Sequence, residues 1–257
     1  MKRLPLLAAA LALVVLPGAA RADEAEVHTM HCLHACPNGA PAGNDLVVRE
    51  IYTLSSNDAR KLADWVAYRV TAETIGSGGE RDWAPDPWLA PDETLEPPDY
   101  DGANRALRTD RGHQAPLASL AGTGRGDDTN LLSNITPQSS ALNQGPWVRL
   151  ENAERDLIRA GGLDTLYVLT GPLYEREMAP LPGADEGHVV PSGYWKVLVT
   201  ADGRLSAFVM NQDMARNAPH CGARVPLEEV ERRSGLSFFS RLFERQFLSL
   251  DAGLGCR

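Results

Sequence analysis

The chain has 257 residues, with 34 acidic side chains, 25 lysines and arginines, and a formal net charge of −9. This length suits one sizeable α/β domain, and no long low-complexity linker divides it. The acidic balance argues against a protein that holds nucleic acid through bulk positive charge. It is compatible with an enzyme that grips phosphate locally through a few arginines.

The N-terminus has the pattern of a secretory signal peptide at residues 1–22. Lys2 and Arg3 provide the positive start, residues 4–16 are apolar, and Ala20-Arg21-Ala22 gives a small-x-small cleavage site. The apolar run is too short to cross a bilayer, which disfavours a membrane anchor. We therefore expect a secreted or periplasmic protein without stable membrane association. Its mature form is a single domain, 23–257, whose formal charge falls from −9 to −12 with the loss of three basic residues.

The mature chain has four cysteines, Cys32, Cys36, Cys221 and Cys256. In an exported protein such cysteines predict disulfide bonds. A second interpretation applies to the N-terminal pair, because the segment from His28 to Cys36 also holds two further histidines. That density of ligands is sufficient for a zinc or copper site.

The first half of the chain predicts two strands and a long connection. Residues 46–54 alternate in polarity and predict a strand, 55–58 predict a turn, and the aromatic and β-branched residues of 65–70 predict a second strand. Residues 71–100 are rich in proline and aspartate, and long ordered loops of this kind are often functional. Arg81 lies within this connection.

The sequence Asp-Arg-Gly-His at 110–113 combines groups that suit phosphate chemistry. In an extended strand Arg111 and His113 project to one side and Asp110 to the other. Gly112 leaves the backbone open to the close approach of a ligand. A guanidinium binds phosphate oxygens in a planar fork, and a neutral imidazole beside it can accept a proton from water.

A helix is predicted over 139–160, with an apolar stripe and a stop at two glycines. Pro146 implies either that the regular helix begins near Asn143 or that the helix kinks. On an ideal helix Asn143 and Glu151 are about 80° apart around the axis and roughly 12 Å apart along it. They therefore cannot both bind one metal directly. One direct ligand and one contact through a metal-bound water fits better.

The second half of the chain predicts sheet and a closing helix. Residues 165–170 predict a buried strand that ends at 171–172, and 194–199 with 205–210 predict a hairpin. A short helix is predicted over 227–233. The residues interpreted as structural are Lys196 as a support of the sheet, His188, His220 and Asp156, and the core aromatics Phe238, Phe239, Phe243 and Phe247.

Four sequence blocks in order carry a family resemblance. They read DRGHQAPLA from Asp110, LSNITPQ from Leu132, LNQGPW from Leu142 and RLE from Arg149. Together they resemble the DNA/RNA non-specific endonucleases of the Serratia nuclease type, with mitochondrial endonuclease G as a more distant relative. The Asp-Arg-Gly-His sequence alone is weak evidence, whereas four ordered blocks at family-like spacing are specific.

The resemblance implies an α+β, ββα-metal nuclease fold with a central antiparallel sheet flanked by helices. It implies hydrolysis of phosphodiester bonds in DNA and RNA, dependent on Mg²⁺ with Mn²⁺ as a substitute ion, and giving 5′-phosphate and 3′-hydroxyl ends. Relatives include dimers, so a homodimer is compatible with it. The biological role and any preference between DNA and RNA are left open.

The resemblance also assigns catalytic roles. His113 is expected as the general base, and Arg111 as a group that stabilises charge on the phosphoryl oxygens. The family has a second catalytic arginine upstream of the histidine. That role falls on Arg81, with Arg108 as the rival position.

Metal binding and support are assigned by the same resemblance. Asn143 is expected as the direct metal ligand, Glu151 as an outer-shell group, and Asn134 as a supporting polar group near the metal and the histidine. Neutral oxygens with one carboxylate suit a hard divalent ion. The resemblance further implies two disulfides, Cys32–Cys36 and Cys221–Cys256.

Two other functions remain open from the sequence. One is a metal-dependent phosphodiesterase that uses the same site on a different diester. The other is a non-enzymatic exported metal-binding protein that acts through the cluster between His28 and Cys36.

Overall fold

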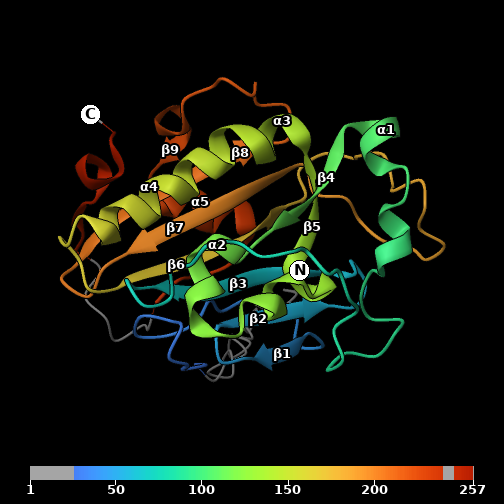
Figure 1. The fold of residues 1–257 in the computed structure, drawn as a ribbon, viewed down its shortest axis with the longest axis horizontal. Helices are drawn as coiled ribbons and strands as arrows, with labels where there is room; N and C mark the ends of the chain where they lie inside the picture. The colour runs from blue at the N-terminus through green and yellow to red at the C-terminus, as the bar shows by residue number, and fades with distance from the viewer. Residues whose placement is uncertain (1–25, 240–245, 257) are drawn as a thin grey trace, which may run out of the picture.

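The structure is a computed structural model that describes residues 26–239 and 246–256 (Figure 1). The proposed signal peptide at 1–22 and the predicted core residue Phe243 lie outside these ranges. A large sheet forms the body of the molecule, and a separate two-stranded ladder stands beside it. No helix in the described ranges has the length and apolar character that crossing a membrane would require.

The large sheet has the order β1-β2-β3-β6-β7-β8-β10, with β9 paired to β8. Every pairing is antiparallel except that of β10 with β8, so the expected central antiparallel sheet is confirmed. Its strands are β1 (Asp45–Val48), β2 (Tyr52–Asn57), β3 (Leu62–Val70), β6 (Leu166–Leu173), β7 (Gly193–Val199), β8 (Arg204–Asn211), β9 (Arg224–Val225) and β10 (Leu248–Ser249).

The second ladder pairs two strands that carry parts of the DRGHQAPLA and LSNITPQ blocks. These are β4 (Thr109–His113) and β5 (Ile135–Ser139), in antiparallel register with Gly112 opposite Thr136. The helices are α1 (Ala103–Leu107), α2 (Leu117–Leu120), α3 (Ser140–Leu142), α4 (Val148–Arg159) and α5 (Leu227–Ser234). The chain thus passes from β4 through β5 into α3 and α4.

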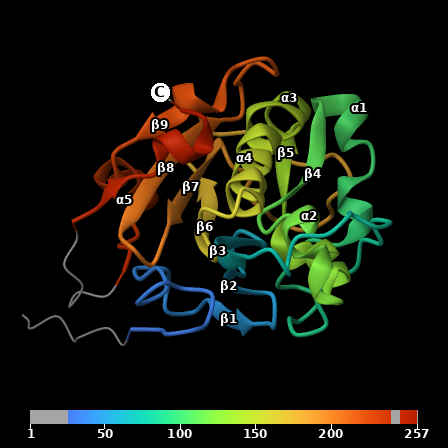
Figure 2. The ribbon, with the colours of Figure 1, turned by 60° about the vertical axis from the view of Figure 1, so that its left-hand side comes forward.

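The large sheet has two covered faces, and the period of two along each strand divides its side chains between them. On β7, Tyr194 and Leu198 belong to the cluster beneath α4, whereas Trp195 and Val197 belong to the cluster beneath α5. Figure 2 shows α4 and α5 on opposite sides of strands β6 to β8. The expectation of a sheet flanked by helices is confirmed.

The predicted strand over 46–54 is wrong, because this segment is a hairpin of β1 and β2. The backbone N–H of Arg49 donates to the carbonyl of Tyr52 and closes the turn. The predicted turn at 55–58 is likewise mostly strand, since β2 runs to Asn57. Ser55 and Asn57 look like turn residues, but their polar groups are hydrogen-bonded inside the fold, to Asn44 and Asp64.

The strand β6 does not end at Gly171-Pro172, as the sequence suggested, but continues to Leu173. Its pairing with β3 stops at Thr170, so beyond that point it has a neighbour only in β7. A proline is tolerated where no neighbouring strand needs its missing N–H.

The predicted helix over 139–160 is kinked, which was one of its two expected forms. Residues Asn143–Trp147 form a π-helical turn in which Gly145 has non-helical angles, φ −122° and ψ −116°. The regular helix α4 follows Pro146. The ideal-helix separation of Asn143 and Glu151 therefore does not apply across this turn, and both residues line the same cavity.

The other predicted elements are confirmed. Strand 65–70 lies within β3, the hairpin is β7–β8, and α5 ends at Gly235 with φ 74°. Phe238 and Phe239 are buried, and Phe247 packs against the same cluster. Both disulfides implied by the resemblance are present. Neither cysteine of the N-terminal segment is therefore available as a thiolate ligand.

Candidate active site

A cavity of about 670 Å³ lies where β4 meets the kink before α4. It brings together Arg81, Arg111, His113, Asn143 and Glu151, which are five of the six predicted site residues. The remaining lining residues are Trp83, Tyr100, Asn104, Thr109, Asp110, Pro116, Leu117, Ala118, Gln144, Val148, Arg155 and Arg216.

His113 is held at the end of β4 by a side chain that the sequence did not single out. Its Nε2 lies 3.1 Å from Oδ1 of Asn130, and its ring centroid is 5.3 Å from that of Trp83. When Nε2–H donates to Asn130, the lone pair is on Nδ1. Burial lowers the pKa of His113 to about 4, with a further lowering from the charge of Arg81 and an opposing effect of the Asn130 hydrogen bond. The imidazole is thus neutral at pH 7.

Arg111 is fixed beside this histidine. Its Nη2 donates to the carbonyl of Pro97 at 2.6 Å, and its guanidinium carbon lies 5.1 Å from the ring centroid of Tyr100 and 5.7 Å from that of Trp83. An arginine held through one nitrogen and two ring faces keeps other donors for a ligand. Its one ion pair in the described residues is with the exposed Asp101 at 3.8 Å.

The two candidates for the second arginine occupy different places. Arg81 is exposed, lines the cavity, and acts electrostatically on His113. Arg108 does not line the cavity and instead caps α1 in the left-handed conformation, with φ 55°. The geometry therefore favours Arg81 over Arg108.

Asp110 organises the polar groups at the kink. Its carboxylate accepts hydrogen bonds from Ser140, Asn104, Asn143 and Gln144, at 2.6, 2.8, 3.0 and 2.8 Å respectively. Burial opposes ionisation, but these four donors outweigh it and lower the pKa of Asp110. Asp110 also lines the cavity, although it alternates along β4 with Arg111 and His113.

Asn143 is oriented by this carboxylate. Because its Nδ2 donates to Asp110, the identity of its other amide atom is fixed as the acceptor Oδ1. Among the hydrogen bonds formed within the described part of the chain, none uses this oxygen. An amide oxygen kept without a protein donor beside a cavity is suited to a cation.

Glu151 lies on the first turn of α4 with 7% of its surface exposed. Burial raises the pKa of its carboxyl, the charge of Lys196 lowers it, and the charge of Glu154 raises it. A further positive charge beside this carboxylate, in addition to that of Lys196, would therefore favour its ionised form.

A buried ion pair supports the sheet beneath Glu151. Lys196 Nζ on β7 lies 3.1 Å from Oε1 of Glu154 and donates to the hydroxyl of Tyr68 at 3.3 Å. The ammonium also lies 4.4 Å from the ring centroid of Trp147. Lys196 and Glu154 are both fully buried, as expected of a lysine that supports the sheet.

The donor set fits a hard divalent cation. Oxygen donors of the amide and carboxylate type are what Mg²⁺, Mn²⁺ and Ca²⁺ prefer, and the unused Oδ1 of Asn143 with the buried carboxylate of Glu151 provides one of each. Asn143 suits direct contact with the ion, because its Nδ2 is held by Asp110 and its Oδ1 is left as an acceptor at the cavity.

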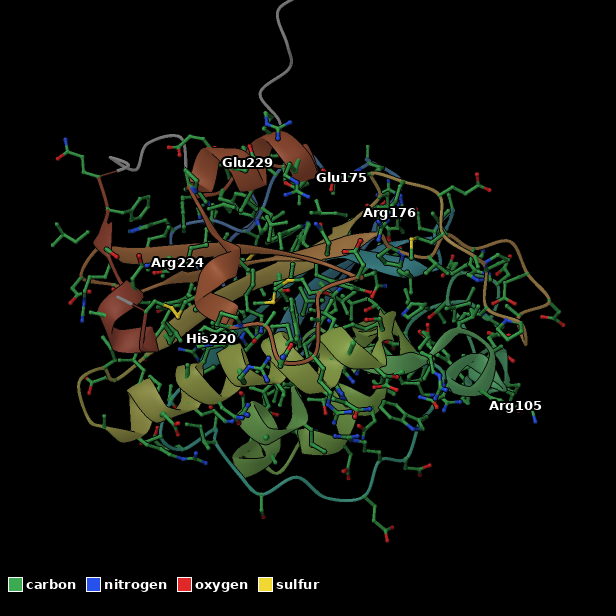
Figure 3. All side chains as sticks on the ribbon, turned by 90° about the horizontal axis from the view of Figure 1, so that it is seen from above. Arg105, Glu175, Arg176, His220, Arg224 and Glu229 are labelled. Carbon is green, nitrogen blue, oxygen red and sulfur yellow. A yellow bond between two sulfur atoms is a disulfide. The ribbon has the colours of Figure 1, made fainter. Side chains whose placement is uncertain are left out.

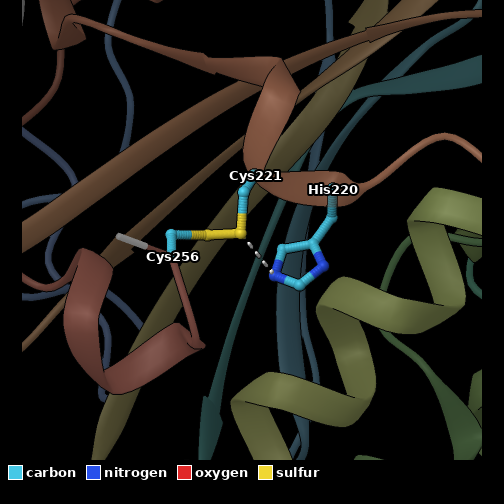
Figure 4. Close-up of side chains that lie close together, drawn as sticks. All are labelled: His220, Cys221 and Cys256. Carbon is cyan, nitrogen blue, oxygen red and sulfur yellow. Dashed lines mark hydrogen bonds between the residues drawn. A yellow bond between two sulfur atoms is a disulfide. The ribbon is translucent and has the colours of Figure 1, made fainter.

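Other groups of possible ligands lie outside this cavity. His220 with Cys221 and Cys256 forms one, but both cysteines are in a disulfide and His220 hydrogen-bonds to the sulfur of Cys221, as Figure 4 shows. There are also two clusters of three acidic residues, and within each cluster the carboxylate oxygens lie within 4.8 Å of one another. These are Asp45 with Asp58 and Glu93, and Asp99 with Asp185 and Glu186.

Asn134 is the predicted site residue that does not line the cavity. It is fully buried, and its side chain accepts from the backbone N–H of Ala115 and donates to the carbonyls of Ala115 and Thr129. Its own carbonyl accepts from Gln114. Asn134 therefore ties together the two segments that carry His113 and Asn130.

The packing of the two-stranded ladder explains why position 112 is a glycine. A Cβ at this position would lie 2.6 Å from Cβ of Gln138 and 2.5 Å from its Oε1. Glycine is therefore required for the packing of β4 against β5, a reason that the sequence alone did not reveal.

Sequence reasoning missed Asn130, Arg155 and Arg216. Asn130 stands seventeen positions after His113 with no local pattern to mark it. Arg155 follows Glu151 by one helical turn, so its presence on the same face of α4 was available from the spacing. Arg216 comes from the loop after β8, and only the fold brings it to the cavity.

Three comparisons with known proteins agree on one family. The model of the DNA/RNA non-specific endonuclease family matches residues 34–245. A nuclease of Serratia marcescens is 47% identical over 228 residues, which cover 86% of each chain. Human mitochondrial endonuclease G is 32% identical over 228 residues, covering 80% of this chain and 73% of the relative.

A solved structure shares the fold. The crystal structure of the EndoG/EndoGI complex contains a chain that superposes with a TM-score of 0.67 at 28% identity, covering 79% of this chain and 89% of that one. The β4, β5 and α3–α4 succession around the cavity is the ββα arrangement that the sequence led us to expect, and the expected fold class is confirmed.

Proposed function

The chain belongs to the DNA/RNA non-specific endonuclease family, and from this premise we propose how its cavity cleaves a phosphodiester bond. The enzyme is an endonuclease that hydrolyses phosphodiester bonds. The observation that carries the proposal is the convergence of a neutral histidine, two arginines and an oriented amide oxygen in one cavity. The substrates are DNA and RNA, and the expected products have 5′-phosphate and 3′-hydroxyl ends.

His113 acts as the general base. Its imidazole is neutral at pH 7, and the hydrogen bond from Nε2–H to Asn130 leaves Nδ1 free to accept a proton from the attacking water. Asn130 fixes the ring plane and the tautomer, as an orienting partner does for other catalytic histidines. Asn134 positions both segments without touching the substrate.

Arg111 and Arg81 bind the phosphoryl oxygens. Arg111 offers the guanidinium nitrogens that Pro97 does not use, and Arg81 is exposed at the same cavity. As negative charge accumulates on the phosphoryl oxygens in the transition state, fixed guanidinium groups stabilise it more than they stabilise the ground state.

We propose that Mg²⁺ is held directly by Asn143, with Glu151 in the outer shell and Mn²⁺ as a substitute ion. When bound, the ion supplies positive charge to the scissile phosphate and to the leaving 3′ oxygen. Asp110 keeps the Asn143 amide turned for this role through its hydrogen bond to Nδ2.

The absence of base selectivity has a physical reason in this site. The groups assigned to catalysis are directed at phosphate oxygens, and phosphate contacts carry no sequence information. The same groups do not distinguish ribose from deoxyribose. Binding through a few local phosphate contacts is also compatible with a protein whose formal net charge is −9.

The test is cleavage of plasmid DNA and of RNA, each with magnesium and with EDTA, beside a small chromogenic diester. We expect both nucleic acids to be cut with magnesium and to survive with EDTA. Cleavage of the small diester alone would contradict the proposed substrate class and favour a phosphodiesterase of another kind.

Export is a further part of the proposal. Two disulfides suit an oxidising compartment, and residues 1–22 have the composition of a cleaved signal peptide. Sequencing the N-terminus of the protein recovered from outside the cytoplasm should give Asp23 as the first residue. An intact N-terminus in the recovered protein would contradict this.

A further inference from the structure

The cavity contains a cation that the proposed mechanism does not use. Arg216 lines the cavity from the loop between β8 and β9, and its side chain is exposed. Within the described part of the chain, no hydrogen bond or ion pair engages its guanidinium. Several other exposed arginines are paired with a carboxylate, as Arg159 is with Asp156 and Arg232 with Glu229.

The backbone of this arginine is clamped against the kink that carries Asn143. The carbonyl of Arg216 accepts from Nη2 of Arg149 at 2.6 Å, and the same nitrogen donates to Ala218 at 2.6 Å. At Gly145 a Cβ would lie 2.6 Å from the carbonyl oxygen of Arg216. The non-helical glycine of the kink therefore permits the close packing of this loop.

The loop is also tied to the start of α3. Gln212 accepts from the backbone N–H of Ser139 at 2.7 Å and donates to the carbonyl of Pro137 at 2.8 Å, while the hydroxyl of Ser139 donates to the carbonyl of Gln212. Because the backbone of this loop is already held in place, binding of a ligand by the Arg216 side chain requires no further ordering of the loop.

Apart from Arg155, which is buried and donates to Ser119 and Asn152, the arginines of the cavity fall on two sides. Arg81 and Arg111 are associated with His113, the first through its effect on the histidine pKa and the second through the shared contact with Trp83. Arg216 lies on the other side, against the kink between Asn143 and α4.

We infer that Arg216 binds the backbone phosphate next to the scissile one on its 5′ side. The inference rests on the proposed function, in which water is activated at His113 and the 3′ oxygen leaves on the Asn143 side. An in-line displacement places attacking and leaving oxygens on opposite sides of the phosphorus. The departing 3′ oxygen belongs to the nucleotide on the 5′ side, so the strand that runs past Asn143 toward Arg216 carries the next phosphate in the 5′ direction.

The experiment uses a single-stranded oligodeoxynucleotide of six residues in which one linkage at a time is replaced by an uncharged methylphosphonate. The cleavage rate at each bond is read from the lengths of the products. In the wild type, a neutral linkage directly 5′ of a bond should slow cleavage of that bond by roughly threefold to tenfold, as the loss of one charged contact does. In Arg216→Ala the unmodified oligonucleotide should be cut more slowly by the same factor through KM, and that neutral linkage should have no further effect.

The control is Arg105→Ala, which removes an exposed arginine of α1 that does not line the cavity and that extends outward in Figure 3. It should behave as the wild type. Arg216→Lys should keep part of the sensitivity, because a charge remains. The slope of binding against salt should fall by about 0.7 in Arg216→Ala, as for one phosphate of a single strand.

Failure of the proposed function and failure of the role of Arg216 give different results in this experiment. If the wild type does not cut the unmodified oligonucleotide with magnesium, the proposed function fails. If it does, and Arg216→Ala keeps the wild-type response to the 5′ neutral linkage, the role of Arg216 is refuted. Loss of sensitivity to the 3′ neighbour instead would refute the assigned direction.

Discussion

The two faces of the large sheet are built for different purposes. The face beneath α4 contains fully buried charge, namely Lys196 and Glu154, with Glu151 at its edge. The face beneath α5 is packed with apolar side chains, among them Trp195 and Phe238, whose ring centroids lie 5.0 Å apart. The same strands make both faces, because successive residues point to opposite sides.

The difference teaches where the fold tolerates an energetic cost. A buried ion pair gives little net stability relative to apolar packing, but it is strongly destabilising to break. On the α4 face the lysine also favours the ionised form of Glu151, which borders the cavity. On the α5 face, no residue of the apolar cluster lines the cavity, and this cluster includes the Cys32–Cys36 disulfide.

The charged face should be the more fragile when one partner is removed. Lys196→Met leaves Glu154 buried without its cation, and we expect a loss of about 3–5 kcal/mol of unfolding free energy. The double change Lys196→Met with Glu154→Gln should recover part of that loss, because no uncompensated charge remains. Denaturant unfolding of the two variants measures both values. Equal stability of Lys196→Met and the wild type would show that the pair is not the organising contact of this face.

A packing void created in the apolar face should lower stability without lowering the rate of cleavage. Phe238→Ala removes a buried ring that packs on Trp195, and such changes cost about 3–5 kcal/mol. The rate of cleavage at temperatures where the variant is folded should match the wild type. A lowered kcat with a fully folded variant, judged by circular dichroism, would contradict the separation of the two faces.

Each face also has one disulfide, and their loops differ in length. Cys221–Cys256 belongs to the α4 side with a separation of 35 residues, and Cys32–Cys36 to the α5 side with a separation of 4. Loop entropy assigns ~4 kcal/mol to the longer loop and ~2 kcal/mol to the shorter. Melting curves of the two double-serine variants should show the larger loss for Cys221 and Cys256. Equal losses would indicate that loop entropy does not govern.

The smallest expected effect is that of acid on the catalytic histidine. The neutral imidazole is the active form, and burial lowers the pKa of His113 to about 4. Between about pH 8 and about pH 5.5 this group should therefore cause no fall in kcat/KM, whereas an unperturbed histidine would titrate near about 6.5. The unfolded chain binds more protons than the folded one between these two pKa values, so the contribution of His113 to stability is lost as pH falls through that window. A fall of kcat/KM to half its value near pH 6.5 would contradict a buried histidine that stays neutral in this range.

Much of the site could be predicted because its residues stand in contiguous blocks. Arg111 and His113 share a strand, and Asn143 and Glu151 stand on either side of one kink, but it was the resemblance of these blocks to a known family that assigned their roles. The hairpin β7–β8 and helix α5 were likewise specified by alternation, turn residues and a terminal glycine.

The rest depended on tertiary contacts. Ser55 and Asn57 have turn composition, yet side-chain partners elsewhere in the fold satisfy them within a strand. Gly112 is explained by Gln138 on the facing strand. Asn130 reaches His113, and Arg216 reaches the cavity, through long-range packing, and no periodicity in the sequence marks such contacts.

The central claim is the division of labour between His113, Glu151 and Asn143 in the cavity. The measurement is the rate of plasmid cleavage against magnesium concentration for His113→Ala, Glu151→Ala and Asn143→Ala, with circular dichroism to confirm the fold. His113→Ala should lose about 10²–10⁴-fold in turnover and should not recover at high magnesium, because the base is gone. Glu151→Ala should need roughly 10–100-fold more magnesium for half activity and should then recover at least in part. Asn143→Ala should behave as a metal-binding defect. If high magnesium restores His113→Ala, then His113 is not the base, and the account is wrong at its centre.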